Sequence, residues 1–441
     1  MLPDYIAKSV PNPANKRAPW YINTAPTYAG IFLWIGFYQS IGEGTLARAS
    51  ALWCLLALAV AGILSYALYY YAPAMLGMKT GLPLYVVGSS TFGTRGGYLM
   101  PGLLMGVLQI GWFAVSTYLA ATFILKALSL DSAPGSVPFA VAAIAWGYVT
   151  AWVGVKGIQY VARISLALNV IPFLMILVVF LKTQPGITSH AVLKPEPFVA
   201  FTLMIQIVLG FFATAGAAGA DFGMNSRNER DVRLGGLVGI SLAVLYAGGL
   251  PLLSIAGARG LFPGMAGFTY DAALASIGGL LASVMFLLYA VASVPSACFC
   301  AFIAGNSFST MLPGVKRFSS TMIGATVSVV LAITGAAANL VTFFQIVGAS
   351  FGPICGAMAA DYLLSGKRWA GPREGINPAG YGAWAAGFLV GIIPFLPVPE
   401  AVRTYAQPAT LYSLITGFVV YAILAKAGLE SKAVPFERRV P

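Results

Sequence analysis

Long apolar segments, almost uninterrupted by charged residues, follow one another along this 441-residue chain. Each is close to the roughly 20 residues that an α-helix needs to cross the hydrocarbon core of a bilayer. Because the segments are continuously apolar rather than alternating, they do not resemble the strands of an outer-membrane barrel. The pattern predicts an all-α polytopic membrane protein with about twelve transmembrane helices, at residues 27–47, 51–76, 98–126, 137–155, 159–181, 198–220, 234–257, 277–304, 319–339, 341–364, 378–397 and 408–425.

The composition argues against an enzyme. Charged residues make up 9% of the chain, whereas soluble domains contain about 25%. Twelve helices leave only loops and tails, in which no separate catalytic domain fits. The sequence has no Gly-rich phosphate-binding loop, which disfavours ATP-driven transport by this chain alone. Its single histidine, His190, lies in a predicted outer loop, so neither a Ser-His hydrolase arrangement nor a His-based zinc site is available.

The basic residues predict the orientation in the membrane. If the N-terminus is cytoplasmic, 19 of the 25 Lys and Arg residues fall in inner segments. Lys and Arg accumulate on the cytoplasmic side of short loops, so both ends of the chain are expected in the cytoplasm. The expected location of the protein is the inner (plasma) membrane. The net charge of +12 then reflects topology and anionic lipid, and nucleic-acid binding need not be invoked. The polar, Pro-rich start predicts no removable signal peptide.

Glycines cluster in the first and sixth predicted spans. The first contains Gly30, Gly36, Gly42 and Gly44, and the sixth contains Gly210, Gly216 and Gly219. Transporters use interrupted helices at corresponding positions of inverted repeats to bind substrate and ion near the midplane. Spans one and six are five apart and so enter from opposite sides, which predicts two inverted five-helix repeats at 27–182 and 198–365. A segment at 1–26 precedes them, and two helices at 378–427 and a tail at 428–441 follow. The alternative is that the glycines serve helix packing alone.

Polar and aromatic residues in the spans indicate a binding site. Gln109 and Trp112 lie one helical turn apart in the third span and share a face. An indole that stacks and an amide that pairs with an edge suit a flat, polar, uncharged ring. Phe211 and Phe212, beside the predicted break in span six, provide a second aromatic surface. The alternative role for all four is packing.

Three carboxylates lie in or at the ends of spans, where ionisable groups are costly and often functional. Glu43 lies near the outer end of span one, and its role is either an interfacial carboxylate or a proton-coupling group. Asp221 and Asp361 end spans six and ten on the predicted cytoplasmic side, each followed by basic residues. We expect both aspartates to pair with Arg or Lys.

In these segments the chain resembles the nucleobase cation symporter family, class one, which includes the bacterial cytosine permeases and hydantoin transporters. The resemblance covers nearly the whole chain. It rests on several short segments in matching order, namely Lys16-Arg17 with Pro19-Trp20, Gly77-Met78-Lys79-Thr80-Gly81-Leu82, Thr91-Phe92-Gly93-Thr94-Arg95-Gly96, Gln109-Ile110-Gly111-Trp112-Phe113, Gly210-Phe211-Phe212, Ala220-Asp221-Phe222, Arg227-Asn228 and Ala359-Ala360-Asp361-Tyr362.

The resemblance implies the leucine-transporter-type fold, with a five-plus-five inverted repeat and two further C-terminal helices. It also implies alternating access and cation-coupled uptake of a nucleobase or related heterocycle such as a pyrimidine or purine. By the same resemblance, Trp112 and Phe212 sandwich the ring and Gln109 bonds its edge. The pocket is then completed by Gly30 and Trp34 from span one, Gly210 and Phe211 from span six, and Tyr289 from span eight.

For the coupling ion, the resemblance implies a sodium site at Gly30, Leu33, Tyr289 and Ser293, with no organic cofactor. The chain departs from the family pattern there, because Ala292 replaces one of two hydroxyl ligands. Tyr289 and Phe211 also stand where cytosine permeases carry Asn and Ser. The ion is therefore Na⁺ or H⁺, and the substrate another neutral planar heterocycle. The alternatives are an amino-acid transporter of the same fold and a channel or sensor.

Overall fold

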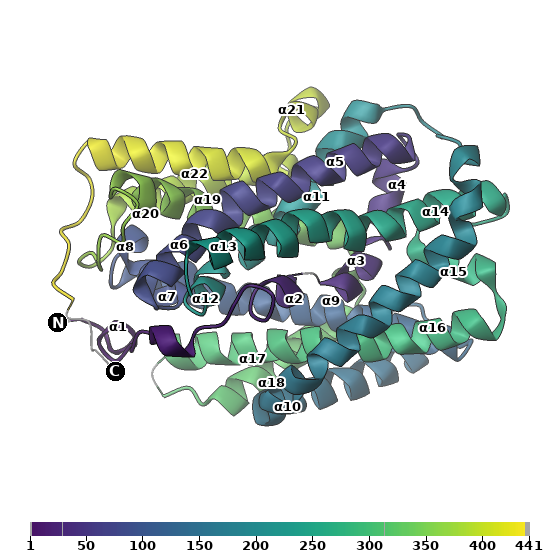
Figure 1. The fold of residues 1–441 in the computed structure, drawn as a ribbon, viewed down its shortest axis with the longest axis horizontal. Coiled ribbons are helices and arrows are strands. Elements are labelled where there is room, and N and C mark those ends of the chain that lie inside the picture. Colours follow the sequence, from purple (N-terminus) through teal and green to yellow (C-terminus); the bar gives the residue numbers. More distant parts are fainter. Residues whose placement is uncertain (1, 29, 313, 437–441) are drawn as a thin grey trace.

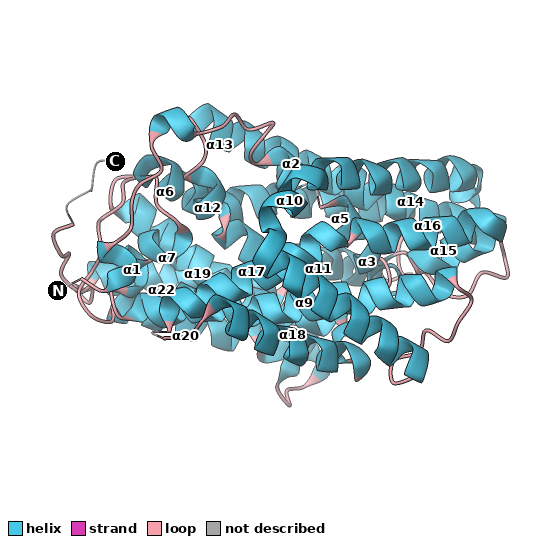
Figure 2. Ribbon diagram, turned by 90° about the horizontal axis from the view of Figure 1, so that it is seen from below, coloured by secondary structure: helices cyan, strands magenta, loops and turns pink. Residues whose placement is uncertain are grey.

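The computed structural model describes residues 2–28, 30–312 and 314–436; the side chains of 27, 31, 32, 157–167 and 169 lie outside this description. The described chain is helical, and its β-structure consists of two isolated bridges, Ala18 with Ser226 and Arg373 with Ala433. Most long helices run side by side along the long axis of the molecule (Figure 1), and Figure 2 shows the connecting loops gathered mainly at its two ends. The predicted all-α class is confirmed.

Within the described residues, nine stretches are long and apolar enough to cross a membrane. They correspond to predicted spans two to eight, ten and twelve, and run over Ala51–Thr80, Gly96–Ala127, Val137–Lys156, Val170–Ser189, Pro197–Ala217, Glu229–Leu261, Gly279–Met311, Leu340–Leu364 and Ala409–Lys426. Predicted spans nine and eleven contain shorter helices, α18 (Arg317–Ile333) and α20 (Pro378–Gly391). The count of twelve stays a prediction.

The first span is divided into three short helices. They are α2 (Ala25–Tyr28), α3 (Ile31–Phe37) and α4 (Ile41–Thr45). Gly30 lies between the first two with a φ of +51°, in the left-handed region. An α-helix cannot continue through this conformation, which costs a residue with a Cβ about 1–2 kcal/mol. The interruption predicted from the glycines is therefore present at Gly30.

The sixth span differs from the prediction. Its main helix, α11 (Pro197–Ala217), continues through Gly210 without a break, and the interruption comes at Ala218, before α12 (Gly219–Gly223). Gly210 instead permits close packing, because a Cβ there would collide with the carbonyl oxygen of Phe344 in α19 (Leu340–Leu364). Placing the glycine break beside Phe211 and Phe212 was thus wrong, and helix packing accounts for this glycine.

The eighth span is also interrupted, which the sequence analysis did not anticipate. It consists of α16 (Gly279–Ala292) and α17 (Val294–Met311), separated at Ser293. By contrast, spans four and five lie in one 47-residue helix, α10 (Val137–Thr183). The predicted connection near Lys156 is therefore not a break in helical structure. Arg163, one of the 19 basic residues counted as inner, lies in predicted span five, and its side chain is outside the described ones.

Other spans carry local irregularities or connect to short helices. Span two consists of α5 (Ala51–Leu64), a π-helical turn at Ser65–Tyr70 and α6 (Tyr71–Thr80). Span seven runs from α13 (Glu229–Gly236) through two π-helical turns into α14 (Gly249–Leu261). The remaining helices are α1 (Asp4–Ala7), α7 (Leu84–Val87), α8 (Ser89–Phe92), α9 (Leu104–Ala127), α15 (Tyr270–Ile277), α21 (Glu400–Tyr405) and α22 (Ala409–Lys426).

The first and last described segments meet at one end of the bundle, at the left of Figure 1. The Tyr5 hydroxyl donates to the Thr94 carbonyl at 2.8 Å, and the Thr94 N–H donates to the Arg373 carbonyl at 2.7 Å. From the other direction, the Val434 N–H donates to the Pro372 carbonyl at 2.7 Å. We call this end of the molecule the terminal face.

Candidate functional site

Helix α9 carries Gln109 and Trp112 on one buried face. The side chains are 9% and 5% exposed. The Trp112 indole N–H donates to the Thr214 hydroxyl of α11 at 3.3 Å. Among the described residues, the Gln109 amide nitrogen donates only to the Met105 sulfur, at 3.7 Å in its own helix. Because a thioether is a weak acceptor, the Gln109 amide has hydrogen-bonding capacity left for another molecule.

The Trp112 indole belongs to a cluster of aromatic rings built by four helices. We call this the aromatic cluster; it consists of Trp34 and Phe37 of α3, Trp112 of α9, Phe211 and Phe212 of α11, and Phe343 and Phe344 of α19. The ring centroids next to the indole are 5.2–6.1 Å away. The structure therefore brings spans one, three, six and ten together around Trp112.

Phe211 occupies the centre of this arrangement. Its ring contacts five others at centroid distances of 4.6–6.3 Å, with interplanar angles of 64–72°. Such edge-to-face geometry is the favoured arrangement of neighbouring aromatic rings. Among the described ring contacts, Phe212 meets Phe211 at 4.6 Å and is not a neighbour of Trp112. The two rings of the predicted sandwich are thus joined through Phe211 rather than facing each other directly.

From span one, Trp34 reaches the cluster and Gly30 lies one turn before it. Trp34 is 1% exposed, and its indole nitrogen has no hydrogen-bond partner among the described residues. The Gly30 carbonyl accepts the N–H groups of Leu33 and Trp34 at 2.9 and 3.4 Å. A buried donor without an acceptor costs about 1–3 kcal/mol, and it marks Trp34 as a second group with unused hydrogen-bonding capacity.

Tyr289 lies in a different environment from the aromatic cluster. Its hydroxyl bonds with the Tyr270 hydroxyl of α15 at 2.7 Å, and its ring contacts Phe123 at 5.9 Å. The Ser293 N–H donates to the Tyr289 carbonyl at 3.1 Å, and the Ser293 hydroxyl donates to the Ala290 carbonyl at 2.7 Å. The break in span eight therefore presents a carbonyl and a hydroxyl, the kinds of ligand that Na⁺ takes, although both already make one bond.

The three carboxylates have different partners. Glu43 is exposed and accepts the Phe268 N–H at 2.7 Å, so it holds the loop before α15. Asp361 pairs with Arg373 at 3.0 Å, as predicted, and both side chains are at least 93% buried. Asp221 accepts the Leu84 N–H at 3.0 Å and forms no ion pair with a described residue. The predicted pairing of Asp221 with Arg or Lys is therefore wrong.

Asp221 lies in α12, beyond the apolar stretch that ends at Ala217. Burial raises the pKa of its carboxyl from 3.8 to about 6, and the hydrogen bond from Leu84 opposes this rise. With no cation beside it, the charged form loses hydration without a compensating ion pair.

The sequence analysis missed several members of the cluster. Phe37 follows Trp34 by three residues, a spacing that places two side chains on one helix face. Phe343 and Phe344 form an adjacent aromatic pair in span ten, like the pair in span six. Both patterns were available in the sequence. Thr214, which accepts the indole N–H, had no comparable signal because isolated threonines are common in membrane helices.

Comparison with known proteins finds a family and several relatives. Residues 10–419 match the family described as permease for cytosine/purines, uracil, thiamine and allantoin. The cytosine permeases of Escherichia coli O157:H7 and of Escherichia coli strain K12 are each 27% identical over 297 residues, which is 67% of this chain. The match covers 66% of the length of these relatives, just under two thirds.

Solved structures with similar folds include two of Mhp1. Its inward-facing conformation superimposes with a TM-score of 0.66 at 16% identity, covering 98% of this chain and 97% of that one. Its closed conformation with bromovinylhydantoin, described as a nucleobase-cation-symport-1 family transporter, gives 0.64 at 18% identity, covering 96% and 98%. A Na⁺-coupled sialic acid symporter gives 0.60 at 14%, covering 98% and 93%. This likeness confirms the leucine-transporter-type fold.

Proposed function

Because this chain belongs to the family of permeases for cytosine/purines, uracil, thiamine and allantoin, we propose that it is a secondary active transporter. It imports a nucleobase or related neutral planar heterocycle, in symport with a cation, by alternating access between the two sides of the membrane. Differential affinity of substrate and ion for the outward and inward states supplies the coupling.

One observation carries the proposal. The Trp112 indole lies among aromatic rings from four helices, one turn from a Gln109 amide whose only described contact is a thioether. Aromatic faces bind a flat ring, and an amide donates and accepts at its edge. The seven members of the aromatic cluster carry no ionised side chain. This supports an uncharged substrate over the amino acid of the rival hypothesis, whose carboxylate needs a cation or a helix N-terminus.

The substrate site in this proposal includes Trp112, Gln109, Phe211 and Phe212, with Trp34 and the backbone of Gly30 and Gly210 beside them. Tyr289 stays in the proposed substrate site because it lies in the last turn before the break of span eight. For the coupling ion, we place the ligands at the carbonyls near Gly30, Leu33 and Tyr289 and at the Ser293 hydroxyl. The Tyr289 carbonyl accepts the Ser293 N–H, and a carbonyl can accept a second bond, whereas the Gly30 carbonyl already accepts the N–H groups of Leu33 and Trp34 and has to release one of them to bind the ion.

The proposal places the protein in the inner (plasma) membrane with the terminal face in the cytoplasm. The excess of Lys and Arg in the segments assigned to that side supports this orientation. The similar fold of a Na⁺-coupled sialic acid symporter makes Na⁺ the first ion to test, with H⁺ as the alternative.

The test is ligand binding by purified protein, measured as thermal stabilisation by cytosine, uracil, adenine, hydantoin and amino acids, with and without Na⁺. Under this proposal a heterocycle stabilises the protein, and Trp112→Ala weakens its binding about 5- to 150-fold, because losing ring stacking costs about 1–3 kcal/mol. Trp152→Ala is the matched control, since that indole is 55% exposed on α10. Stabilisation by an amino acid alone, or unchanged binding in Trp112→Ala, contradicts the proposal.

The ion is tested by uptake into vesicles of the heterocycle identified in this way. Ser293→Ala weakens the dependence on Na⁺ if the hydroxyl is a ligand. Uptake that is indifferent to Na⁺ but collapses with a protonophore assigns the coupling to H⁺ and removes the sodium site. Absence of accumulation against a gradient supports the channel or sensor.

A further inference from the structure

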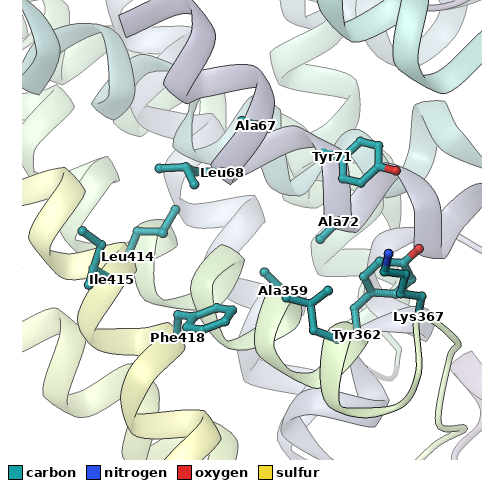
Figure 3. A pocket seen from close by; sticks show the side chains of 11 residues that line it. Ala67, Leu68, Tyr71, Ala72, Ala359, Tyr362, Lys367, Leu414, Ile415 and Phe418 are labelled. Carbon is teal, nitrogen blue, oxygen red and sulfur yellow. The ribbon is translucent and has the colours of Figure 1, made fainter. Parts of the chain in front are cut away.

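A cavity of about 380 Å³ lies between span two, α19 and α22 (Figure 3), and none of its lining residues belongs to the aromatic cluster. Its walls are apolar, and include Leu68 and Ala72 of span two, Ala359 of α19, and Leu414 and Phe418 of α22. Two further lining residues, Leu363 and Ile415, are 50% and 45% exposed. The cavity is therefore open at the surface of the bundle, between exposed apolar side chains of the predicted spans, and we call it the lateral groove.

One end of the lateral groove is polar. Tyr71, Tyr362 and Lys367 lie together there, as Figure 3 shows, away from Leu68, Leu414 and Ile415. The Tyr71 hydroxyl donates to the Glu229 carboxylate at 3.2 Å. The Lys79 ammonium donates to the Lys367 carbonyl at 2.7 Å and lies 5.4 Å from the centre of the Tyr362 ring. The groove thus combines a long apolar wall with a polar end.

The polar end adjoins a second hollow of about 410 Å³, lined by Glu229, Arg230, Arg233 and Leu234. Glu229 connects the two hollows, because it accepts from Tyr71 and pairs with Arg233. Among the described residues, Arg230 and Lys367 form no ion pair. Arg233 pairs with Glu229 and Lys79 acts on the same carboxylate, while Arg230 lines the second hollow and Lys367 lines the lateral groove. Asp231, the other carboxylate nearby, is paired with Arg227, so the region carries a net positive charge.

We propose that the lateral groove binds an anionic phospholipid of the leaflet that borders the terminal face. Its acyl chain lies along Leu68, Leu414 and Phe418, and its phosphate lies beside Lys367. Charge complementarity selects this occupant, because a zwitterionic lipid gains less from the cationic end. The apolar walls open toward the membrane rather than toward water, which distinguishes a lipid from a soluble anion. A bound lipid would join span two to the C-terminal helix α22.

The proposal is tested by native mass spectrometry of the full chain in detergent, with phosphatidylglycerol or phosphatidylcholine of the same acyl chains added. Wild-type protein is expected to retain phosphatidylglycerol preferentially. Lys367→Gln is expected to lower the apparent affinity for phosphatidylglycerol about five-fold, which is the contribution of one lysine near an anionic lipid surface. Lys316→Gln is the matched control, because Lys316 is exposed and lines neither hollow.

A second variant, Ile415→Trp, fills the apolar part of the groove without changing charge. It is expected to reduce retention of both lipids at an unchanged melting temperature. Equal retention of the two lipids by wild-type protein overturns the proposal, as does an equal loss in Lys316→Gln and Lys367→Gln. These measurements need no transport substrate, so their failure is distinct from a failure of the proposed transport function.

Discussion

Replacing Phe211 with alanine removes the central ring of the aromatic cluster. Phe211 is 7% exposed and contacts five rings. In a membrane protein the unfolded chain keeps its side chains in detergent or lipid, so the loss arises from packing. At about 24 cal/mol per Å³ of cavity, a phenyl-sized void of roughly 100 Å³ costs about 2.4 kcal/mol. Lost ring–ring contacts, at about 0.5–1.5 kcal/mol for a pair, increase this cost.

The expected decrease in the free energy of unfolding for Phe211→Ala is therefore about 5 kcal/mol, from the void and from five ring contacts at about 0.5 kcal/mol each. It is measured by equilibrium unfolding with sodium dodecyl sulfate in mixed micelles. Phe388→Ala is the control, because its partly buried ring on α20 has one described ring neighbour, Trp384 at 5.0 Å; about 1 kcal/mol is expected there. Equal losses in both variants would refute the inference that the rings form a tightly packed cluster.

Three further predictions concern the breaks and the terminal face. Arg373→Gln leaves the buried charge of Asp361 without its cation and lowers the unfolding free energy by about 3–5 kcal/mol; a loss below that of an exposed Arg→Gln change would contradict this. Asp221 has a folded-state pKa of about 6, above the ordinary 3.8, so stability falls as pH rises between these values. Asp221→Asn keeps the acceptor for Leu84 and should melt higher than wild type above about pH 7 but equally near pH 4; a constant difference across this range would count against the burial argument. Gly30→Ala forces a Cβ into the left-handed region and should destabilise the protein by about 1–2 kcal/mol, whereas an unchanged melting temperature would exclude a strained break.

The sequence predicted the positions of nine apolar stretches because bilayer thickness sets helix length. The nine apolar stretches fall on predicted segments, most within a few residues at each end. Breaks were predicted less well. Gly30 adopts a conformation that glycine favours, but Gly210 lies inside a continuous helix, where the absence of a Cβ avoids a collision with Phe344. A glycine in a sequence does not reveal which of these roles it has, since both depend on the neighbouring helix.

The candidate site was predicted in part. Gln109 and Trp112 share a buried face of α9, as their spacing indicated, and Phe211 lies against the indole. The contact between Phe211 and the rings of α19 depends on how spans six and ten cross, which local spacing does not determine. The partners of the carboxylates show the same limit. Asp361 pairs with an arginine 12 residues further along the chain, whereas Asp221 accepts a hydrogen bond from a backbone N–H of α7.

The central position of Phe211 has a consequence for the substrate site that we propose. The Phe211 ring is in edge-to-face contact with five other rings. A planar ligand that enters the cluster therefore has to separate rings that already attract one another. The net affinity of the ligand is then the difference between the ring–ring contacts that break and the ring–ligand contacts that form. Aliphatic ligands recover little of what they displace, so under the proposed function the packed rings themselves disfavour such ligands before any hydrogen bond forms.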